Sequence, residues 1–319
     1  MLSILATSSA ITGPDGHPIP SDRAREAVRG GFDPHVHVAP DFAPRRIDDL
    51  ALATRCEQVG LAGFGLKSHY TATHERAAVV SAAHPGIRAL GTITLNHAVG
   101  GLNATAVEVA ARQGARIVWL PTVSSPQEYA EVESTDPDGK VPVWVRFELE
   151  LRAAGVRPGP VPVLDDSGRP LPALLEVLEV IAHRGLVLAT GHLSQPEIVT
   201  VVDAAVAARV ETIVVTHPEF PSQSIPPAVQ RELADRGALM ERAFTTPYTG
   251  KCTWEAVFEA TRAVGAAHTV WGSDLGQVFN PPVEDGLAIM ADRFLQAGFS
   301  EQEIRLMAVE NTRRLAGAG

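Results

Sequence analysis

Two histidines one residue apart, His35 and His37, are the residues whose types and spacing most directly suggest chemistry. They end a short apolar stretch, residues 31–38, that we predict to be a buried β-strand. Residues i and i+2 of a strand point to the same face, so both imidazoles would enter one space while Val36 turns away. Two convergent neutral imidazoles form half of a site for a divalent metal. A single His-x-His can also occur by chance at the surface or in the core, so the metal-site interpretation depends on residues elsewhere in the chain.

Residues of similar chemistry stand at the ends of later apolar stretches. Together they form a candidate site of His35, His37, Lys67, His69, His97, His192, His217, Glu241 and Asp274. A divalent metal held by nitrogen and oxygen ligands can lower the pKa of a bound water from about 15.7 to about 7. A carboxylate near that water can accept its proton and later deliver it to a leaving group, and the placement of Asp274 fits that role.

Each of these positions also has a purely structural interpretation. His192 or His217 could hydrogen-bond a backbone carbonyl at a strand end, and Asp274 could cap the next helix. His97 could support the site or pack in a loop, whereas Glu241 could pair with the adjacent arginine or with a neighbouring strand, or contact or orient a substrate. Independent structural roles at so many strand ends explain the pattern less well than one shared site does.

Lys67 is one of three lysines in the chain, with Lys140 and Lys251, and it lies in an apolar stretch in phase with His69. Burial of a lysine favours its neutral amine. A neutral amine can react with carbon dioxide to give a carbamate, a carboxylated lysine that can bridge two metals. Alternatively, Lys67 could clamp a substrate carboxylate or extend its amine to solvent.

The elements that must position these residues recur along the chain. Apolar stretches that we predict to be strands cover residues 31–38, 62–69, 87–95, 115–120, 186–191, 211–216, 238–242 and 269–273. Amphipathic segments with helical periodicity separate most of them, which predicts parallel strands joined by helices. Eight such units predict an α/β fold, a (β/α)8 TIM-like barrel, whose active site lies at the carboxyl ends of the strands.

We predict residues 1–30 to be an N-terminal leader and residues 31–319 to be a single barrel domain. Residues 124–171 break the strand–helix rhythm and are rich in Pro, Gly and Asp. We interpret them as an insertion after the fourth strand, made of a helix and a short hairpin before a helix that begins near Pro172. An insertion there would lie over the barrel mouth and shape the substrate pocket.

Composition excludes several classes of partner. The chain has 319 residues, a net charge of −10 and no run of Lys or Arg, which argues against nucleic acid and anionic membrane surfaces. No stretch approaches the roughly 18 apolar residues of a membrane helix, and the N-terminal segment lacks the features of a signal peptide. Cys56 and Cys252 form no disulfide framework, so we expect a cytoplasmic protein. A homo-oligomer is compatible with the sequence, which leaves the oligomeric state open.

Several motifs resemble the amidohydrolase superfamily of metal-dependent hydrolases. They are the run from Phe32 to His37, Gly191-His192, Thr216-His217-Pro218, Gly272-Ser273-Asp274 and the closing run from Glu310 to Leu315. A closer resemblance, to a family of unknown function of the DUF6282 type, rests on the runs Leu66–His69, Ala189–Ser194 and Ser273–Gln277. The resemblance covers roughly residues 30–316, and the motifs are specific for the superfamily as a set.

This resemblance implies a distorted barrel with one or two divalent metals. It implies that His35, His37, His192, His217 and Asp274 are metal ligands or catalytic residues. The chain departs from the superfamily in one respect. Many two-metal members carry a bridging carboxylated lysine or a glutamate at the end of strand four, where this chain has Pro121-Thr122 and instead places a lysine on the second strand. Either Lys67 acts from a different strand or the site holds one metal.

We therefore expect a metal-dependent hydrolase that cleaves a C–N bond in an amide or cyclic amide of a small molecule. Zinc is the expected metal, with manganese or iron as alternatives. Asp274 would manage the proton, and His192 or His217 would bind the metal or stabilise the developing oxyanion. His69, His97 and Glu241 are the expected substrate-binding residues. Lactone or phosphoester hydrolysis and decarboxylation are alternatives on the same barrel, and a non-catalytic metal-binding or partner-binding barrel is the alternative of another class.

Overall fold

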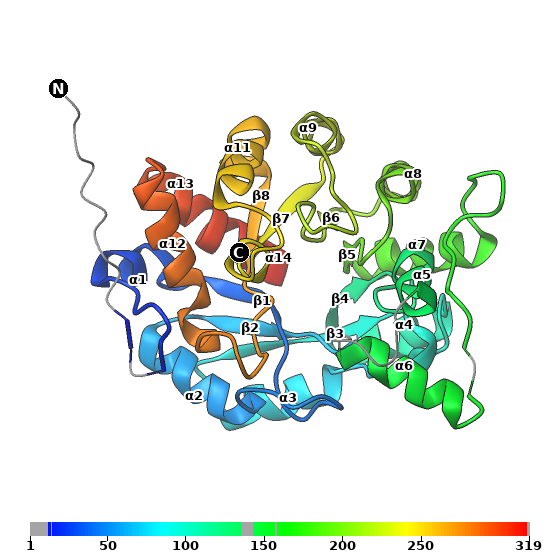
Figure 1. Cartoon of the computed structure of the whole chain (residues 1–319), viewed down its shortest axis with the longest axis horizontal. Coiled ribbons are helices and arrows are strands. Elements are labelled where there is room, and N and C mark those ends of the chain that lie inside the picture. The colour runs from blue at the N-terminus through cyan, green and yellow to red at the C-terminus, as the bar shows by residue number, and fades with distance from the viewer. Residues whose placement is uncertain (1–11, 14, 135–142, 157, 318–319) are drawn as a thin grey trace.

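The computed structural model describes residues 12–13, 15–134, 143–156 and 158–317 and contains one eight-stranded sheet curled into a barrel (Figure 1). Each strand pairs in parallel with the next one along the chain. The strands are β1 Phe32–Val36, β2 Gly63–Leu66, β3 Arg88–Thr94, β4 Ala115–Trp119, β5 Val187–Ala189, β6 Thr212–Val215, β7 Leu239–Ala243 and β8 Thr269–Gly272. Seven strands lie within their predicted stretches and β7 extends one residue beyond residues 238–242, so the predicted (β/α)8 barrel is confirmed.

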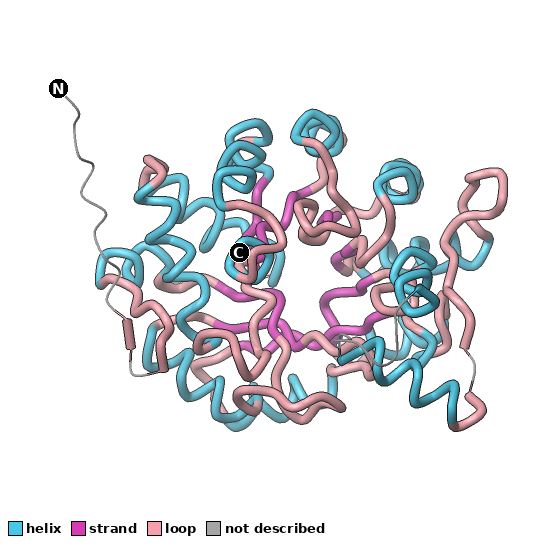
Figure 2. The backbone as a smooth tube through the Cα atoms, viewed as in Figure 1, coloured by secondary structure: helices cyan, strands magenta, loops and turns pink. Residues whose placement is uncertain are grey.

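Helices surround the strands on the outside, as Figure 2 shows. Those that follow or flank the strands are α1 Asp22–Val28, α2 Asp49–Val59, α3 His74–Ala83, α4 Ala104–Arg112, α7 Pro172–Arg184, α8 Gln195–Ala207, α9 Pro227–Asp235, α10 Thr245–Tyr248, α11 Trp254–Val264, α12 Gly286–Gln296, α13 Glu301–Arg305 and α14 Asn311–Ala316. Short 3₁₀ segments cover His97–Val99, Ala266–His268 and Val283–Asp285, and a π-helical turn covers Leu306–Glu310. In the described part of the chain, no helix is long and apolar enough to cross a membrane.

The strands are apolar because they are covered on both sides. Inward-facing side chains such as Ile117, Trp119 and Val187 form a core inside the barrel, which Leu315 of α14 joins. Outward-facing side chains pack against the surrounding helices, as Val118 and Leu188 do in one of the two larger clusters. With its interior filled, the barrel leaves chemistry to the residues at its rim.

Capping residues fix where the helices begin, and the cap of α8 lies shortly after the candidate site residue His192. Ser194 and Glu197 form a capping box at the start of α8, with the Ser194 N–H donating to Glu197 at 2.8 Å. The loop from β5 to α8 therefore has only a few residues, and His192 is fixed between two rigid elements. Asp48 is a simple N-cap of α2, because its side chain accepts from the Ala51 N–H at 2.7 Å.

The insertion after β4 differs in content from the prediction. Among the described residues it holds two helices, α5 Pro126–Ser134 and α6 Val143–Ala153, where the sequence predicted one. The run Trp144–Leu151 lies in α6, with Val145 and Glu148, three residues apart, on its buried face. An isolated antiparallel bridge between Leu164 and Pro170 stands where the hairpin was predicted.

Candidate active site

His35, His37 and Asp274 present one nitrogen or oxygen atom each within 4.8 Å of one another, a geometry that could hold a metal ion. Asp274 Oδ1 lies 3.2 Å from His35 Nε2 and 3.1 Å from His37 Nε2. The Nδ1 atom of His37 is buried and has no hydrogen-bond partner among the described residues. Two imidazoles and one carboxylate form a donor set that fits zinc and other first-row divalent metals.

The seam where β8 meets β1 brings these three residues together. The Asp274 N–H donates to the His35 carbonyl at 2.8 Å, and the His37 N–H donates to the Leu275 carbonyl at 2.7 Å. Asp33, which is buried, also accepts from the Ser273 N–H at 2.9 Å. The backbone therefore joins the first and last strands at the level of the candidate ligands, although they stand far apart in the sequence.

Asp274 and His217 also have unusual backbone conformations, with φ of +55° and +26°. Non-glycine residues in the left-handed region cost about 1–3 kcal/mol each and are found preferentially at functional sites. Both residues lie two positions after the end of a strand, β6 or β8, and their side chains join the cluster at the barrel opening. The fold thus maintains two strained positions in the part of the barrel where chemistry is expected.

Five imidazoles surround this opening. Ring centroids lie 5.4 Å apart for His35 and His37, 4.9 Å for His37 and His69, and 5.9 Å for His69 and His192. The ring centroids of His192 and His217 lie 4.9 Å apart, and those of His217 and His35 lie 6.2 Å apart, so the five imidazoles form a closed ring of neighbours. The sequence predicted that these residues share one site, and the structure brings them into one cluster.

Two of these rings, His35 and His217, are fixed by hydrogen bonds at Nδ1. Nδ1 of His35 lies 2.9 Å from Glu241, and Nδ1 of His217 lies 3.2 Å from Gln223 Oε1. Nδ1 of His192 lies 3.2 Å from a Glu128 oxygen, but the two atoms do not form a hydrogen bond. The partners of His35 and His217 are acceptors, so in the neutral rings Nδ1 carries the proton and Nε2 keeps a lone pair suited to a metal.

His69 is held the opposite way. Its Nδ1 lies 2.8 Å from Thr122 Oγ1, and that oxygen already accepts a hydrogen bond from the Asn96 amide at 2.7 Å. The Thr122 hydroxyl is therefore free to donate to His69 Nδ1, which places the ring proton on Nε2. Unlike His217, His69 would act as a hydrogen-bond donor through Nε2.

Burial controls the charges of these rings. It holds the pKa of His37 and of His69 well below the usual range, and burial with neighbouring His192 lowers the pKa of His217 to about 3. Burial and Lys67 would also lower the pKa of His35, but Glu241 and Asp274 prevail and raise it to about 9. The two carboxylates thus favour positive charge near His35, and either a proton on the ring or a bound divalent cation can supply that charge.

Lys67 follows β2 and points into the same space. Its Nζ lies 2.9 Å from His35 Nε2 and 5.3 Å from the centre of the Trp119 ring. Burial lowers the pKa of this amine, although Asp274 and Glu241 oppose the shift. The structure therefore places the lysine beside the nitrogen that a metal on His35 would use.

Two buried residues of the site were not identified from the sequence. Glu128 lies on α5, is 5% exposed, and accepts a hydrogen bond from Ser222 Oγ at 2.9 Å as well as contacting His192. Asn96 joins the loops after β2, β3 and β4, because its amide donates to the His69 carbonyl and its oxygen accepts from the Thr122 N–H. Asn96 has a sequence signal in its position directly after the third strand, whereas Glu128 has none.

Two predicted substrate-binding residues lie in unexpected surroundings. His97 begins a 3₁₀ segment, contacts the Gly159 carbonyl and lines a cavity beside Asn96 instead of joining the histidine cluster. Glu241 is 3% exposed, and its oxygens contact His35 Nδ1 and the His217 N–H. A β-carbon at Gly272 would lie 2.7 Å from Glu241 Oε1, so the glycine leaves room for the Glu241–His35 pair.

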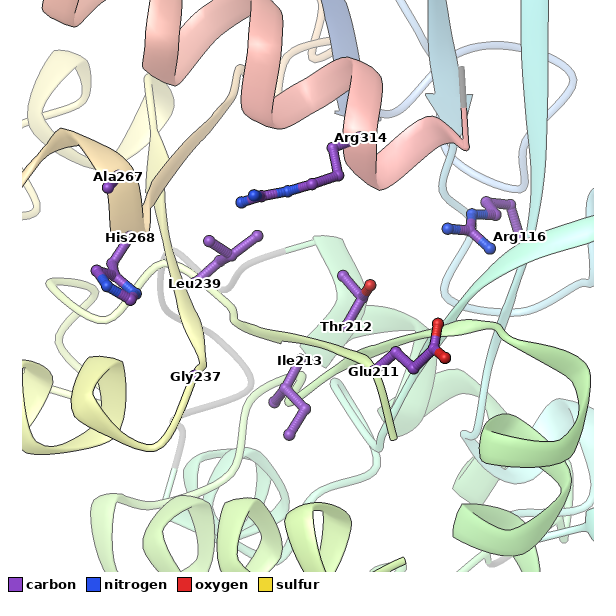
Figure 3. A pocket seen from close by; sticks show the side chains of 9 residues that line it. All are labelled: Arg116, Glu211, Thr212, Ile213, Gly237, Leu239, Ala267, His268 and Arg314. Atoms are coloured by element: carbon purple, nitrogen blue, oxygen red, sulfur yellow. The ribbon is translucent and has the colours of Figure 1, made fainter. Parts of the chain in front are cut away.

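A second cavity lies at the opposite end of the barrel. It has a volume of about 620 Å³ and is lined by residues at the starts of β6, β7 and β8. Arg314 extends into view from α14, and Arg116 and Glu211 lie across the cavity from His268 (Figure 3). Catalytic residues of such barrels come from the carboxyl ends of the strands. The histidine cluster, at the correct end, is therefore the candidate active site.

Comparison with protein families found one match. The model of a family of unknown function, DUF6282, matches residues 30–241, which is more than half of the chain. That range includes His35, Lys67, His192 and His217 and ends before Asp274. A comparison with curated proteins found no match.

Comparison with solved structures found similar barrels. The chain is similar to an amidohydrolase from Pseudomonas aeruginosa, with a TM-score of 0.60 and 12% identity over 92% of this chain and 98% of that one. It is similar to a metallo peptidase from Rhodobacter sphaeroides liganded with a phosphinate mimic of the dipeptide L-Ala-D-Ala (0.57, 13%, 91% and 99%). It is also similar to an amidohydrolase from Burkholderia multivorans with bound zinc (0.52, 13%, 90% and 99%). At these identities the likeness shows the fold.

Proposed function

The chain belongs to the DUF6282 family, as its motifs predicted, and we propose that it is a zinc-dependent hydrolase that cleaves an amide or cyclic amide C–N bond in a small molecule. The observation that carries this proposal is the convergence of His35, His37 and Asp274 within 4.8 Å at the carboxyl end of a barrel. The amidohydrolase and metallo peptidase relatives that share the barrel support it. Amidohydrolases and peptidases cleave C–N bonds, which favours this reaction over the lactone, phosphoester and decarboxylation alternatives.

A divalent metal bound there supplies a Lewis acid that lowers the pKa of water and polarises a carbonyl. Asp274 accepts the proton of the attacking water and delivers it to the leaving nitrogen. His217, with an Nε2 lone pair, and His192, whose ring adjoins it at 4.9 Å, are assigned as further ligands. His69 donates from Nε2 to the developing oxyanion, which makes it the substrate-contacting histidine.

The opening of the site favours catalysis over a purely structural metal. The side chain of Asp274 is 18% exposed and that of His192 is 13% exposed, whereas His35 is fully buried. A structural metal site is usually closed by its four ligands, while a catalytic site keeps one position accessible to water. The exposed edge of this cluster is where a substrate can approach.

The direct test combines metal loading with a substrate panel. Purified protein would be stripped with a chelator, reloaded with zinc, manganese or iron, and assayed against dipeptides, N-acyl amino acids, cyclic amides, lactones and phosphoesters. We expect amide turnover that requires metal and is highest with zinc. Turnover confined to lactones or phosphoesters would assign one of the alternative reactions, and failure to bind any metal would leave the non-catalytic barrel.

Lys67 is expected to control the metal count. With a neutral Lys67, one divalent metal leaves the three carboxylates Asp274, Glu241 and Glu128 incompletely compensated. A carbamate on Lys67 adds one negative charge, and two divalent metals then balance the four anionic groups. We therefore expect about two metals per chain in the parent and one or none in Lys67→Ala, measured by elemental analysis.

The measurement separates the remaining roles of Lys67. One metal per chain in both proteins would assign the lysine to substrate binding and the site to one metal. Intact mass spectrometry at neutral pH, with and without bicarbonate, gives an independent check for a gain of about 44 Da, the mass of carbon dioxide, that depends on Lys67.

Glu241 is proposed to position His35, a revision of its expected role in substrate binding. Glu241→Gln keeps the shape of the side chain but removes the charge that accepts from Nδ1 of His35. Replacing such a partner of a metal-binding histidine typically weakens metal binding by about 10–100-fold. We expect a zinc affinity lower by that factor, measured by competition with a chromogenic chelator.

Glu148→Gln is the matched control, because Glu148 is equally buried at 3% exposure but lies on α6 and contacts no histidine of the cluster in the described residues. Its zinc affinity should stay within about twofold of the parent. Equal losses in both variants would mean that Glu241 acts only through general stability. The visible spectrum of the cobalt-loaded protein should change in Glu241→Gln alone.

A further inference from the structure

A cavity of about 600 Å³ lies beside the proposed active site and has mostly apolar walls. They come from the loops after β1, β2 and β8 and from α6, with Phe42, Tyr70, Trp144, Val278 and Phe279 among them. We propose that this aromatic cavity binds an uncharged apolar group of the substrate, preferably an aromatic ring. The inference rests on the proposed function, because it names the substrate class of that same site.

The aromatic cavity adjoins the histidine cluster. His69 lines it, and the ring of His69 is stacked on that of His37 at 4.9 Å. Gln277 also lines it and donates from its side-chain amide to the Asp274 carbonyl at 3.1 Å. A molecule held at the cluster can therefore extend directly into the cavity.

The walls are built to receive a ring. Phe42 and Tyr70 meet edge to face at 4.7 Å, and Phe147 of α6 packs on both of them, at 4.2 Å and 5.1 Å. The loop after β8 presents Val278 and Phe279 with exposed fractions of 56% and 74%. Neighbouring apolar side chains this exposed indicate a surface that a ligand covers, and the volume is in the range of small-molecule sites.

The charged residue that lines the aromatic cavity, Arg45, is already paired. Its guanidinium contacts Asp41 at 2.8 Å, and the two side chains are only 9% and 2% exposed. A charged substrate group would have to break this pair or remain unmatched. An uncharged group avoids that cost, which is why the proposal specifies an apolar occupant and not a second carboxylate.

Two hydroxamates test the proposal with zinc-loaded protein, since both bind zinc through the same head group. Acetohydroxamate has only a methyl group, whereas 3-phenylpropionohydroxamate carries a ring that can enter the aromatic cavity. We expect the phenyl compound to bind about 10–100-fold more tightly by calorimetry. Val278→Asp should remove most of this difference without changing the affinity for acetohydroxamate.

Val109→Asp is the matched control, because Val109 is also a half-exposed valine (48%) but lies on α4, away from the cavity. It should leave both affinities unchanged. Equal affinities of the two hydroxamates for the parent, or the same loss in both variants, would overturn the proposal.

A second probe separates this inference from the proposed function. If acetohydroxamate does not bind, the proposed zinc site is refuted. The aromatic cavity can still be tested with 3-phenylpropionamide, because binding of this amide needs no metal and can be followed by ligand-observed NMR. Binding of this amide to the parent and its loss in Val278→Asp would still support the aromatic cavity. No binding of the amide to the parent would refute it.

Discussion

Replacing Asp274 with asparagine is expected to lower kcat by about 10²–10⁴-fold on the best substrate of the panel, the range typical of losing a general base. Asparagine keeps an oxygen that can accept the Thr245 hydroxyl hydrogen bond, which Asp274 Oδ2 now accepts at 2.8 Å. It also tolerates the left-handed conformation at φ +55° better than most residues do. The fold should therefore survive while the group that accepts the proton is lost.

Thr245→Val serves as the companion variant, because it removes the hydrogen bond that orients Asp274 but leaves the carboxylate in place. We expect a decrease in kcat of about tenfold or less, with unchanged metal content. Melting temperature and zinc stoichiometry are measured on both variants. If Asp274→Asn kept kcat within tenfold of the parent while still binding metal, proton transfer would have to be assigned to another residue.

The strand-end residues of the site could be predicted because strand geometry is local and regular. Alternation along β1 puts His35 and His37 on one face, and parallel strands bring their carboxyl ends to one rim. The same alternation decides a question that the sequence left open. Glu241 points into the barrel toward His35, whereas Arg242 points outward and contacts Glu219 and Gln230, so the adjacent pair does not meet.

Residues beyond the strands could not be predicted with the same rule. Directly after β3 the chain turns into the 3₁₀ segment that begins at His97, and alternation ends there. Asn96, at 1% exposure, is the residue that enters the site, while His97 contacts the insertion at Gly159. Histidine is the more suggestive residue type, but the backbone turn determines which side chain faces inward.

Glu128 illustrates a different limit. It reaches His192 because α5 folds back over the barrel rim after β4, and this path depends on tertiary packing. The sequence shows only an insertion rich in turn-forming residues, without periodicity that links it to the fifth strand. A residue on an inserted helix can therefore support the site without any local pattern that reveals it.

Gly276→Ala is expected to be the most destabilising single-methyl change at the active site. An alanine β-carbon there would lie 1.5 Å from the His37 carbonyl oxygen, at a φ of +136° that side chains rarely adopt. The backbone after β8 would have to leave β1, breaking the hydrogen bond from the His37 N–H to the Leu275 carbonyl. We expect a loss of at least about 3 kcal/mol in the free energy of unfolding, measured by urea denaturation of the metal-free protein.

Gly298→Ala separates the clash from the backbone conformation. Gly298 also has a positive φ, +87°, but a β-carbon there meets no described atom within 4 Å, so only the conformational cost of about 1 kcal/mol applies. Because the proposed ligands His35, His37 and Asp274 span the β1–β8 seam, opening the seam should also impair metal binding. Zinc should therefore raise the melting temperature of the parent and of Gly298→Ala by similar amounts, and that of Gly276→Ala by much less. Equal zinc stabilisation of all three proteins would show that the metal is held without the seam, and would move the site away from these three residues.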